Sequence, residues 1–439
     1  MSDDSKLPTG RLGRLARLAR AGASTGIAMF RNGKDASVGA EKATKILGQL
    51  RGVATKVGQM ASYVDGVVPP EHRDTFEASM AKLRAAAPRS TSAQIRALVE
   101  AELGAPIEER FAEWDDEPLA SASIGQVHRA TTREGQAVAV KVQHHGIVEA
   151  MEADLKNAGL FDVMARTFGL GKFEVGRLID EARTRFREEL DYGLEARRQK
   201  AFAALYEDQP KIIIPTVVDD YSTNRVLSTT LMEGMDFEEA CRADEDQRRQ
   251  WCETLWHFVY GSIMVGGSFN ADPHPGNYAM QPDGRVVFFD FGCVQPIELE
   301  RRELILRAHD AAFEKDYPRF DEAAAQMLMV APGKHRERVL EYMHYALSPV
   351  FHSPFRVTRE FATEVVDRFK AMAAEFRKLP ADQFVAMPPG ILFLNRLQFG
   401  FFSILARLDA EADYAAVERR FVPQGWETLK AEKAGSAPR

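Results

Sequence analysis

The sequence predicts an α+β fold of two lobes with a helical extension in front of them. Residues 137–142, 212–218 and 225–231 are short runs rich in β-branched side chains, which is typical of strands. Beyond Pro296 the apolar residues instead follow a helical period to about Phe421. Strands in the middle of the chain and helices after them favour a small lobe built on a sheet, followed by a helical lobe.

The first hundred residues are helical in period and carry no chemistry of their own. An apolar stripe runs through 43–60, a Pro-Pro pair at 69–70 separates the next helix, and Ser and Thr residues at 90–92 cap a third. We therefore divide the chain into a helical extension (1–105), a sheet-bearing lobe with inserted helices (106–230), a helical lobe (231–425) and a flexible polar tail (426–439).

Charge and composition exclude several classes of protein. The net charge of −7 argues against nucleic-acid binding, and three cysteines without metal-ligand spacing fit a reducing compartment. No N-terminal apolar run suits a secretory signal, and the most apolar segment near the C-terminus, 397–406, is about half of the ~20 residues that a membrane span needs. We expect a cytoplasmic protein without a signal peptide or transmembrane helix, attached at most peripherally to the inner face of a membrane.

The N-terminal region is an exception to the acidic balance, because residues 1–60 carry 11 Lys/Arg and 4 Asp/Glu. Arg11, Arg14, Arg17 and Arg20 recur at every third position between leucines, which is the pattern of a basic amphipathic helix. Such a helix can lie on an anionic membrane surface. The alternative is an arginine face that packs on the protein's own domain, and the pattern suits both equally.

The strongest chemical signal is an Asp and an Asn five residues apart, Asp272 and Asn277, followed by a buried strand and a D-F-G triplet that starts at Asp290. Phosphotransferases use this order of residues to hold metal, nucleotide and nucleophile together. Asp272 would orient the attacking group or accept its proton, whereas Asn277 and Asp290 would supply hard oxygen ligands to magnesium. We interpret His274 as a hydrogen-bonded structural residue rather than a metal ligand or base.

An earlier strand of sequence V-A-V-K ends near Lys141 and follows a loop of small residues that starts at Ala120. Small side chains let a backbone approach phosphate groups closely, and the lysine would pair with phosphate oxygens. On its own the segment suits an ordinary hairpin with an exposed lysine, but its position ahead of the D-F-G triplet favours phosphate binding. An acidic helix downstream offers Asp191 or Glu195 as the partner of Lys141.

Together these motifs resemble those of the UbiB-type atypical kinase family, the AarF and coenzyme Q8 group, over about residues 10–420. That family shows a K-x-G-Q helix, an alanine-rich loop, a V-A-V-K-V-Q strand, an E-L-D-Y-x-x-E-A helix, an A-D-P-H-P-G-N loop and D-F-G. This chain carries them at 56–59, 120–123, 138–143, 189–196, 271–277 and 290–292. The resemblance implies a bilobal protein-kinase-like fold in which the N-terminal helical extension packs over the active-site cleft.

The resemblance also implies roles for individual residues. Lys141 and Asp272 would be catalytic, and Asn277 and Asp290 would bind magnesium. The nucleotide would be bound by Ala120, Ser121, Ala122, Ser123, Gly125, Gln126, Lys141, Glu195, Leu231 and Met232. The regulatory residues that would cover the nucleotide site are Lys56, Gly58, Gln59, Glu189 and Asp191.

In the family that this chain resembles, the motifs serve ATP-dependent phosphoryl transfer or ATP hydrolysis in support of ubiquinone or related lipid metabolism at membranes. The resemblance therefore implies Mg²⁺ and ATP (or ADP) as cofactors. The implied partners are an anionic membrane surface, lipid or quinone intermediates and a biosynthetic enzyme complex, with no nucleic acid. Two alternatives stay open: a nucleotide-binding scaffold without catalysis, and a protein kinase acting in trans, which the K-x-G-Q extension disfavours.

The chain departs from the family pattern at several positions. Asn270 stands where the family usually has His, Ser121 adds a hydroxyl to the alanine-rich loop, and Thr230 aligns with the usual glutamate of the nucleotide-base hinge. The hinge change bears on nucleotide preference. None of these departures removes a metal ligand.

Overall fold

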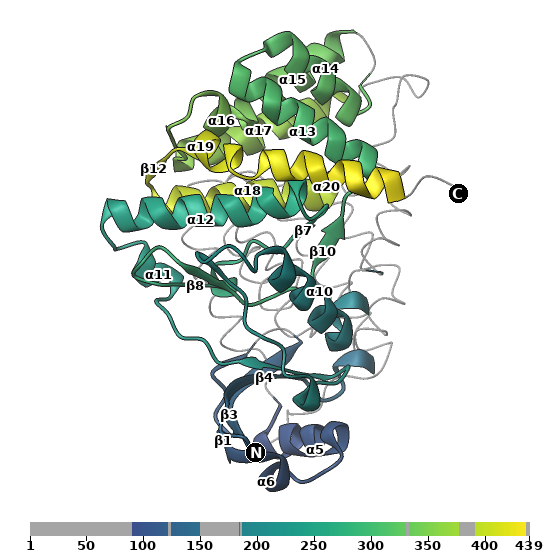
Figure 1. Ribbon diagram of the computed structural model, residues 1–439, viewed down its shortest axis with the longest axis vertical. Helices are drawn as coiled ribbons and strands as arrows, with labels where there is room; N and C mark the ends of the chain where they lie inside the picture. Colours follow the sequence, from purple (N-terminus) through teal and green to yellow (C-terminus); the bar gives the residue numbers. More distant parts are fainter. Residues whose placement is uncertain are drawn as a thin grey trace, which may run out of the picture. The chain divides into compact units, whose positions relative to one another are not determined.

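The computed structural model describes residues 90–121, 124–149, 184, 187–330, 333–376 and 391–435 (Figure 1). Several sequence predictions fall outside these residues and keep the status of predictions. They are the basic helix of 11–20, the packing of the extension, the regulatory residues Lys56, Gly58 and Gln59, and the loop residues Ala122 and Ser123.

The described chain forms two compact units, which we call the sheet unit and the helical unit. The sheet unit holds the described residues up to Arg197 together with Thr216–Leu231, and the helical unit holds Arg198–Pro215 and the residues from Met232 onward. Both units contain helices and strands, so the α+β class is confirmed. Residues 198–215 were predicted to belong to the sheet-bearing lobe, and they belong instead to the helical unit.

The sheet unit contains the elements α5 (Ser92–Leu103), α6 (Ile107–Arg110), β1 (Phe111–Trp114), β2 (Ala120–Ser121), β3 (Gly125–Thr132), β4 (Ala137–Gln143), η1 (Asp219–Tyr221) and β6 (Val226–Thr230). The five strands form one antiparallel sheet of order β1-β3-β4-β6, with β2 paired to β3. Helix α10 (Tyr192–Leu205) begins in this unit and passes into the helical unit after Arg197.

Side-chain alternation along β4 gives the sheet one apolar face. Val138, Val140 and Val142 are each 0% exposed and pack in one core cluster with Ile95 and Val99 of α5. The side chains between them, including Lys141, therefore point to the opposite face. The capping residues predicted at 90–92 are confirmed, because Thr91 and Gln94 cap α5 reciprocally.

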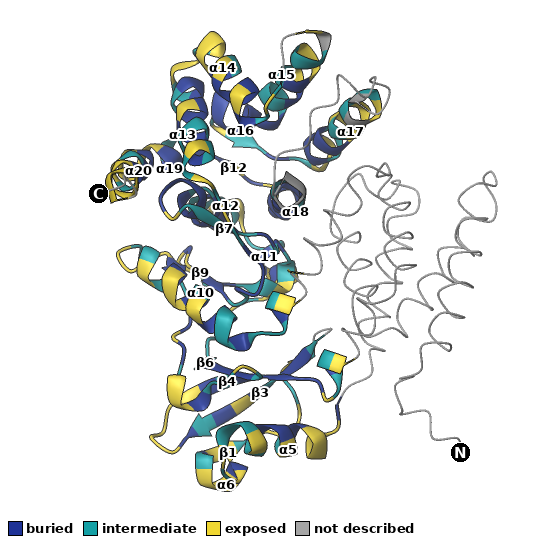
Figure 2. Ribbon diagram, turned by 90° about the vertical axis from the view of Figure 1, so that its right-hand side faces the viewer, coloured by how far each residue is buried: buried dark blue, intermediate teal, exposed yellow. Residues whose placement is uncertain are grey.

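The helices of the helical unit are α11 (Phe237–Ala240), α12 (Glu245–Met264), α13 (Leu299–Glu314), α14 (Tyr317–Met327), α15 (Lys334–Ala346), α16 (Ser348–Phe351), α17 (Arg359–Phe376), α18 (Ile391–Leu408), α19 (Tyr414–Arg419) and α20 (Val422–Gly435). Helix α12 lies in the core of this unit, and Figure 2 colours much of it as buried. Its Trp251 and Trp256 are both 0% exposed, and Trp256 contacts Tyr414 of α19 with ring centres 4.2 Å apart.

The strands of the helical unit are β5 (Ile212–Ile213), β7 (Ser268–Asn270), β8 (Tyr278–Met280), β9 (Val286–Phe288), β10 (Val294–Pro296), β11 (Phe355–Arg356) and β12 (Glu411–Ala412), with the short helix η2 (Pro275–Asn277) between β7 and β8. They form the sheets β5-β9-β8, β7-β10 and β11-β12. Strand β5 was predicted in the sheet-bearing lobe, but it pairs in parallel with β9. A short apolar run does not reveal in the sequence which strand it pairs with.

The predicted flexible tail 426–439 is corrected by helix α20, which continues to Gly435. Leu429 of this helix is 2% exposed. The fully buried Arg302 also reaches it, with Nη1 2.9 Å from Oε1 of Glu432. The polar residues of this segment therefore belong to a helix packed on one side.

The apolar run 397–406 lies in α18, where Leu397, Phe401 and Leu405 are buried in the core of the helical unit. Across the described parts of the chain, no helix is both long enough and apolar enough to cross a membrane.

Candidate active site

Lys141 on β4 and Glu195 on α10 form a bidentate ion pair. The Nζ atom of Lys141 lies 2.7 and 2.9 Å from the two carboxylate oxygens of Glu195. The side chain of Glu195 is 2% exposed and that of Lys141 is 19% exposed. Nζ also lies 5.0 Å from the centre of the Tyr192 ring, and this cation–π contact further stabilises the positive charge of Lys141. Of the two acidic candidates in the sequence, Glu195 is therefore the residue that contacts Lys141.

Asp191 acts at the start of α10 instead. Its Oδ1 accepts a hydrogen bond of 2.9 Å from the backbone N–H of Leu194, which satisfies one of the free donors at the helix N-terminus. The side chain of Gln143, at the end of β4, donates to the carbonyl oxygen of Leu190 at 2.7 Å. Gln143 thus ties the strand of Lys141 to the segment that leads into the helix of Glu195. The sequence motif contains this glutamine, but no role for it was predicted.

Gly125 has a clear packing role. A Cβ atom at this position would lie 2.5 Å from the carbonyl oxygen of Val142 and 2.6 Å from the hydroxyl of Tyr192. Both neighbours are 0% exposed, so neither can move away easily. Glycine is therefore needed for β3 to approach β4 and α10, whatever its relation to a nucleotide.

The side chain of Gln126 lies on the face of the sheet opposite Lys141, and the nucleotide-binding role of this residue stays a prediction. Gln126 is paired with Val142, so its side chain lies on the apolar face and not on the face of Lys141. It is 2% exposed, and its Nε2 donates to the carbonyl oxygen of Ser90 at 3.2 Å. Its Oε1 lies 3.2 Å from Nε2 of His128. This side chain therefore connects the start of α5 to the sheet.

The other predicted nucleotide residues of this unit lie on strands or at their ends. Ala120 and Ser121 form β2, and the hydroxyl oxygen of Ser121 is buried without a hydrogen-bond partner in the described structure. The O–H group of such a serine can donate a hydrogen bond to a ligand oxygen. The backbone N–H of Leu231 donates to the carbonyl oxygen of Ala137 at 3.0 Å, so this hinge residue extends the sheet. Glu189, which was predicted as a regulatory residue, is buried in this unit, with a relative exposure of 7%.

In the helical unit, Asn270 connects the loop of Asp272 to the D-F-G triplet. Its Oδ1 accepts a hydrogen bond of 3.0 Å from the backbone N–H of Asp272. Its Nδ2 donates to the carbonyl oxygen of Asp290. Strand β7, which ends at Asn270, also pairs with β10, so the two segments are joined by strand pairing as well. Asparagine thus makes these two bonds at a position where the family that the chain resembles usually has histidine.

The predicted metal ligands are held by the same loop. Asn277 donates through Nδ2 to the carbonyl oxygen of Asp272 at 3.0 Å, and its own carbonyl oxygen accepts from the N–H of Phe289 at 3.1 Å. Asp290 follows directly after Phe289, and its Oδ1 accepts from the N–H of Gly292 at 2.9 Å. The two residues therefore come from backbone segments that are bonded to each other.

His274 has the structural role that its loop position predicted. Its Nδ1 accepts a hydrogen bond of 2.9 Å from the backbone N–H of Gly276, which caps the short helix η2. Arg198 of α10 donates to the carbonyl oxygen of Gly292 at 2.9 Å and so holds the end of the D-F-G triplet. The sequence offered no signal for Arg198.

Arg396 of α18 is a candidate functional residue that was not predicted from the sequence. Its Nη2 lies 2.6 Å from Oδ1 of Asp272, and the two side chains are only 12% and 17% exposed. Its Nη1 also lies 3.8 Å from Sγ of Cys293. In the sequence Arg396 is visible only as the charged residue before an apolar run, and its distance along the chain from Asp272 hides the contact.

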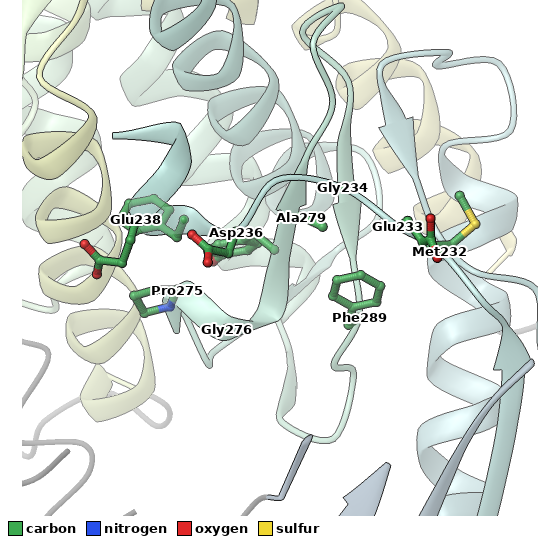
Figure 3. Close-up of a pocket in the computed structure, with 11 residues that line it drawn as sticks. Met232, Glu233, Gly234, Asp236, Glu238, Pro275, Gly276, Ala279 and Phe289 are labelled. Atoms are coloured by element: carbon green, nitrogen blue, oxygen red, sulfur yellow. The ribbon is translucent and has the colours of Figure 1, made fainter. Parts of the chain in front are cut away.

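A hollow of about 700 Å³ lies next to this loop, entirely within the helical unit. Figure 3 shows Met232, a predicted nucleotide residue, on its wall with Pro275 and Phe289 of the loop region. Asp236 and Glu238 add carboxylates to the lining. Its volume lies within the range of about 300–1,000 Å³ that is usual for small-molecule sites.

The donor set suits magnesium better than a metal that requires a full protein cage. Within the residues that the structure describes, no group of three or more His, Cys, Asp or Glu side chains could hold a metal ion. Asn277 and Asp290 offer an amide oxygen and a carboxylate on neighbouring segments. Magnesium is commonly bound by one or two such side chains together with phosphate oxygens and water, so these residues fit it.

Comparisons with known proteins agree with the motifs. A family model described as the ABC1 atypical kinase-like domain matches residues 82–324. The chloroplastic protein Activity of BC1 Complex Kinase 8 of Arabidopsis thaliana is 32% identical over 287 residues, which cover 63% of this chain and 37% of that protein. The atypical kinase COQ8 of Saccharomyces cerevisiae mitochondria is 30% identical over 285 residues, which cover 62% of this chain and 56% of that protein.

A solved structure shares the fold over most of the chain. The Rv3197–erythromycin complex from Mycobacterium tuberculosis matches with a TM-score of 0.60 and 29% identity, over 87% of this chain and 94% of that one. The chain spans about a third to somewhat over half of the two relatives named above. Because the family model covers more than half of its residues, the chain belongs to the ABC1 atypical kinase-like (UbiB) family.

Proposed function

We propose that this protein is a magnesium-dependent, ATP-binding atypical kinase or ATPase that supports ubiquinone or related lipid metabolism at a membrane. The membrane and quinone parts of this proposal rest on the family and on the basic pattern at 11–20. ATP (or ADP) and Mg²⁺ are the proposed cofactors. Lipid or quinone intermediates, an anionic membrane surface and a biosynthetic enzyme complex are the proposed partners.

The observation that carries the proposal is the ion pair of Lys141 with Glu195, at 2.7 and 2.9 Å. In protein kinases a strand lysine must pair with a helix glutamate before the lysine can hold the nucleotide phosphates. A merely structural lysine would gain little from a carboxylate that is 2% exposed, because burying that charge is costly. The pair therefore favours a functional lysine.

Each residue then has one task. Lys141 pairs with the phosphate oxygens, and Asp272 orients the acceptor hydroxyl or water and accepts its proton. Asn277 and Asp290 hold magnesium, which when bound neutralises charge on the phosphates. Asn270 keeps the loop of Asp272 in register with the D-F-G triplet through its two hydrogen bonds.

Asp290→Asn tests the proposal directly. We expect ATP turnover to fall at least about a hundredfold and the magnesium dependence of nucleotide binding to disappear, because one charged ligand is lost. Asp283→Asn is a matched control, since Asp283 is an exposed carboxylate that pairs with Arg285. If Asp290→Asn keeps wild-type turnover and magnesium-dependent nucleotide affinity, the proposed function is wrong.

A second candidate function is a nucleotide-binding scaffold without turnover. The contact of Arg396 with Asp272 favours it, because a guanidinium at 2.6 Å competes with an acceptor hydroxyl for the same carboxylate. Arg396→Gln separates the two functions. A kinase or ATPase that uses Arg396 to position Asp272 should lose about tenfold in kcat with little change in nucleotide affinity. A scaffold should show no turnover in either form of the protein.

A further inference from the structure

A second hollow lies in the helical unit, distant in sequence from the loop of Asp272. Its volume is about 540 Å³, and residues of α15, β11 and the start of α17 line it, together with Ser348 of α16. A hollow of roughly 300–1,000 Å³ can hold a small molecule. The lining residues lie between 345 and 364, beyond the stretch 82–324 that the family model matches. The phosphotransferase motifs therefore do not explain this hollow.

Aromatic side chains form one wall of the hollow. The rings of Tyr345 and Phe361 are stacked with centres 5.1 Å apart, and Phe355 meets Phe361 edge-on at 5.1 Å. Phe361 is 6% exposed and belongs to the core, so it anchors the other two rings, which are half-buried. The faces of such rings carry negative potential and attract cations.

Two carboxylates on α17 line the hollow. Glu360 and Glu364 are one helical turn apart and share a face of the helix. Arg356 is the one cation among the described lining residues, and it already contacts Glu245 and donates to the carbonyl oxygen of Asp409 at 2.7 Å. The helix N-terminus adds about half of a positive charge, and Arg368 pairs with Glu364, so Glu360 is the lining carboxylate that forms no ion pair among the described residues.

A cation of the chain already uses two of these groups. The guanidinium of Arg368 lies 4.3 Å from the centre of the Tyr345 ring, and its Nε lies 2.7 Å from Oε1 of Glu364. Both charged side chains are more than 40% exposed, at 42% and 45%, so their ion pair is weak and can be exchanged. The ring and the carboxylate are therefore arranged to hold a cationic group between them.

We propose that this hollow binds an organic cation with an apolar body, such as a quaternary ammonium compound or a protonated tertiary amine. The charged group takes the place of the Arg368 guanidinium beside Glu364 and against the ring of Tyr345, with Glu360 one helical turn away. The apolar body packs on Phe355 and Phe361. None of these residues belongs to the Lys141 strand, the Asp272 loop or the D-F-G triplet, so the proposal stands apart from the proposed phosphotransferase function.

Benzyltrimethylammonium is a suitable probe, titrated calorimetrically into the full chain with benzyl alcohol as the uncharged comparison. The wild type should bind the cation about tenfold more tightly than the alcohol. The double variant Glu360→Gln, Glu364→Gln should bind the cation about tenfold more weakly, and Tyr345→Leu about threefold more weakly. Asp367→Asn, on the same helix but outside the hollow, is the matched control and should bind as the wild type does.

Arg368→Ala adds a gain of binding that a misfolded variant cannot imitate. Removing this guanidinium leaves Glu364 and the Tyr345 ring available, so the cation affinity should rise about threefold. A fall in affinity in Arg368→Ala would overturn the proposal. So would equal affinities of the wild type and the double glutamine variant for the cation, or equal affinities of the wild type for the cation and the alcohol.

Discussion

The candidate catalytic residues of the two units are held in place by different means. In the sheet unit, Lys141 and Glu195 lie on a strand and a helix and contact each other directly, at 2.7 and 2.9 Å. In the helical unit, the loop of Asp272 and the segment of Asp290 are connected by side-chain to backbone hydrogen bonds and by strand pairing. The residues of the sheet unit depend on one buried charge pair. The loop of Asp272 and the segment of Asp290 depend on several weaker bonds to each other, and Asp272 in addition pairs with Arg396.

This difference predicts how each region responds to substitution. Removing one partner of a buried ion pair leaves the other charge unpaired in a medium of low dielectric constant, at a cost of about 3–5 kcal/mol. A single hydrogen bond to the backbone contributes only about 0.5–1.5 kcal/mol. We therefore expect a large loss of stability when one partner of the Lys141–Glu195 pair is removed. Removing one hydrogen bond between the Asp272 loop and the Asp290 segment should cause a smaller loss.

Lys141→Met should give the largest effect. It leaves the carboxylate of Glu195, which is 2% exposed, without its charged partner. We expect the free energy of unfolding to fall by about 3 kcal/mol and ATP turnover to fall at least about a hundredfold. Chemical denaturation and a steady-state ATPase assay measure the two quantities.

Lys211→Met is the matched control for this prediction, because Lys211 is an exposed lysine. It should change neither quantity. A loss of stability below about 1 kcal/mol in Lys141→Met would mean that the ion pair behaves like an exposed one. The contrast drawn between the two units would then disappear.

Substitutions of Asn270 test whether the helical unit loses stability in small steps. Asn270→Ala removes the hydrogen bonds to the backbone of Asp272 and Asp290, so stability should fall by about 1–2 kcal/mol and kcat by about tenfold. Asn270→His can restore one of the two bonds and should give an intermediate loss. Ser268→Ala, two residues earlier on β7, serves as the control. If both Asn270 variants lost stability and activity completely, this loop would be as sensitive to a single substitution as the ion pair is.

Much of the secondary structure around the candidate site could be predicted from the sequence. The strand that carries Lys141, the helix 245–266 and the buried strand before Asp290 have strong periodic patterns, and each is present as β4, α12 and β9. Their residues interact mainly with near neighbours or follow the alternation of a sheet, so local patterns describe them well.

The remainder depends on contacts that no local pattern encodes. Arg396 reaches Asp272 from a helix more than a hundred residues away, and nothing in the sequence around it marks that partner. Gln126 was assigned to the nucleotide by its motif, but the strand register turns its side chain to the other face. Ile212 and Ile213 were predicted in the sheet-bearing lobe, but they pair with β9 within the helical unit, and a two-residue strand gives no sign of its partner in the sequence. In each of these examples, strand register or a contact between residues distant in the sequence determines where the residue lies.

Acid should weaken the helical unit through His257. Burial, together with the nearby charge of Arg420, lowers the pKa of His257 to about 4. In the unfolded chain the pKa returns to about 6.5, so the unfolded state binds the proton more readily below that pH. The stability held by the neutral imidazole is therefore complete above about pH 7 and is lost as the pH falls towards 4. At pH 5 we expect the loss to be about 2 kcal/mol.

His257→Phe should remove this loss, because the phenyl ring can keep the stacking on Phe421, whose ring lies 4.9 Å away, and cannot take up a proton. Hydrogen exchange at pH 7 and pH 5, followed separately in peptides of the two units, measures the effect where it arises. Burial also lowers the pKa of His128 in the sheet unit, although its hydrogen bond to Asp115 opposes the shift, so that unit should weaken less. The exposed His352→Gln is the control. Equal acid losses in the wild type and His257→Phe would assign the pH response of the helical unit to other groups.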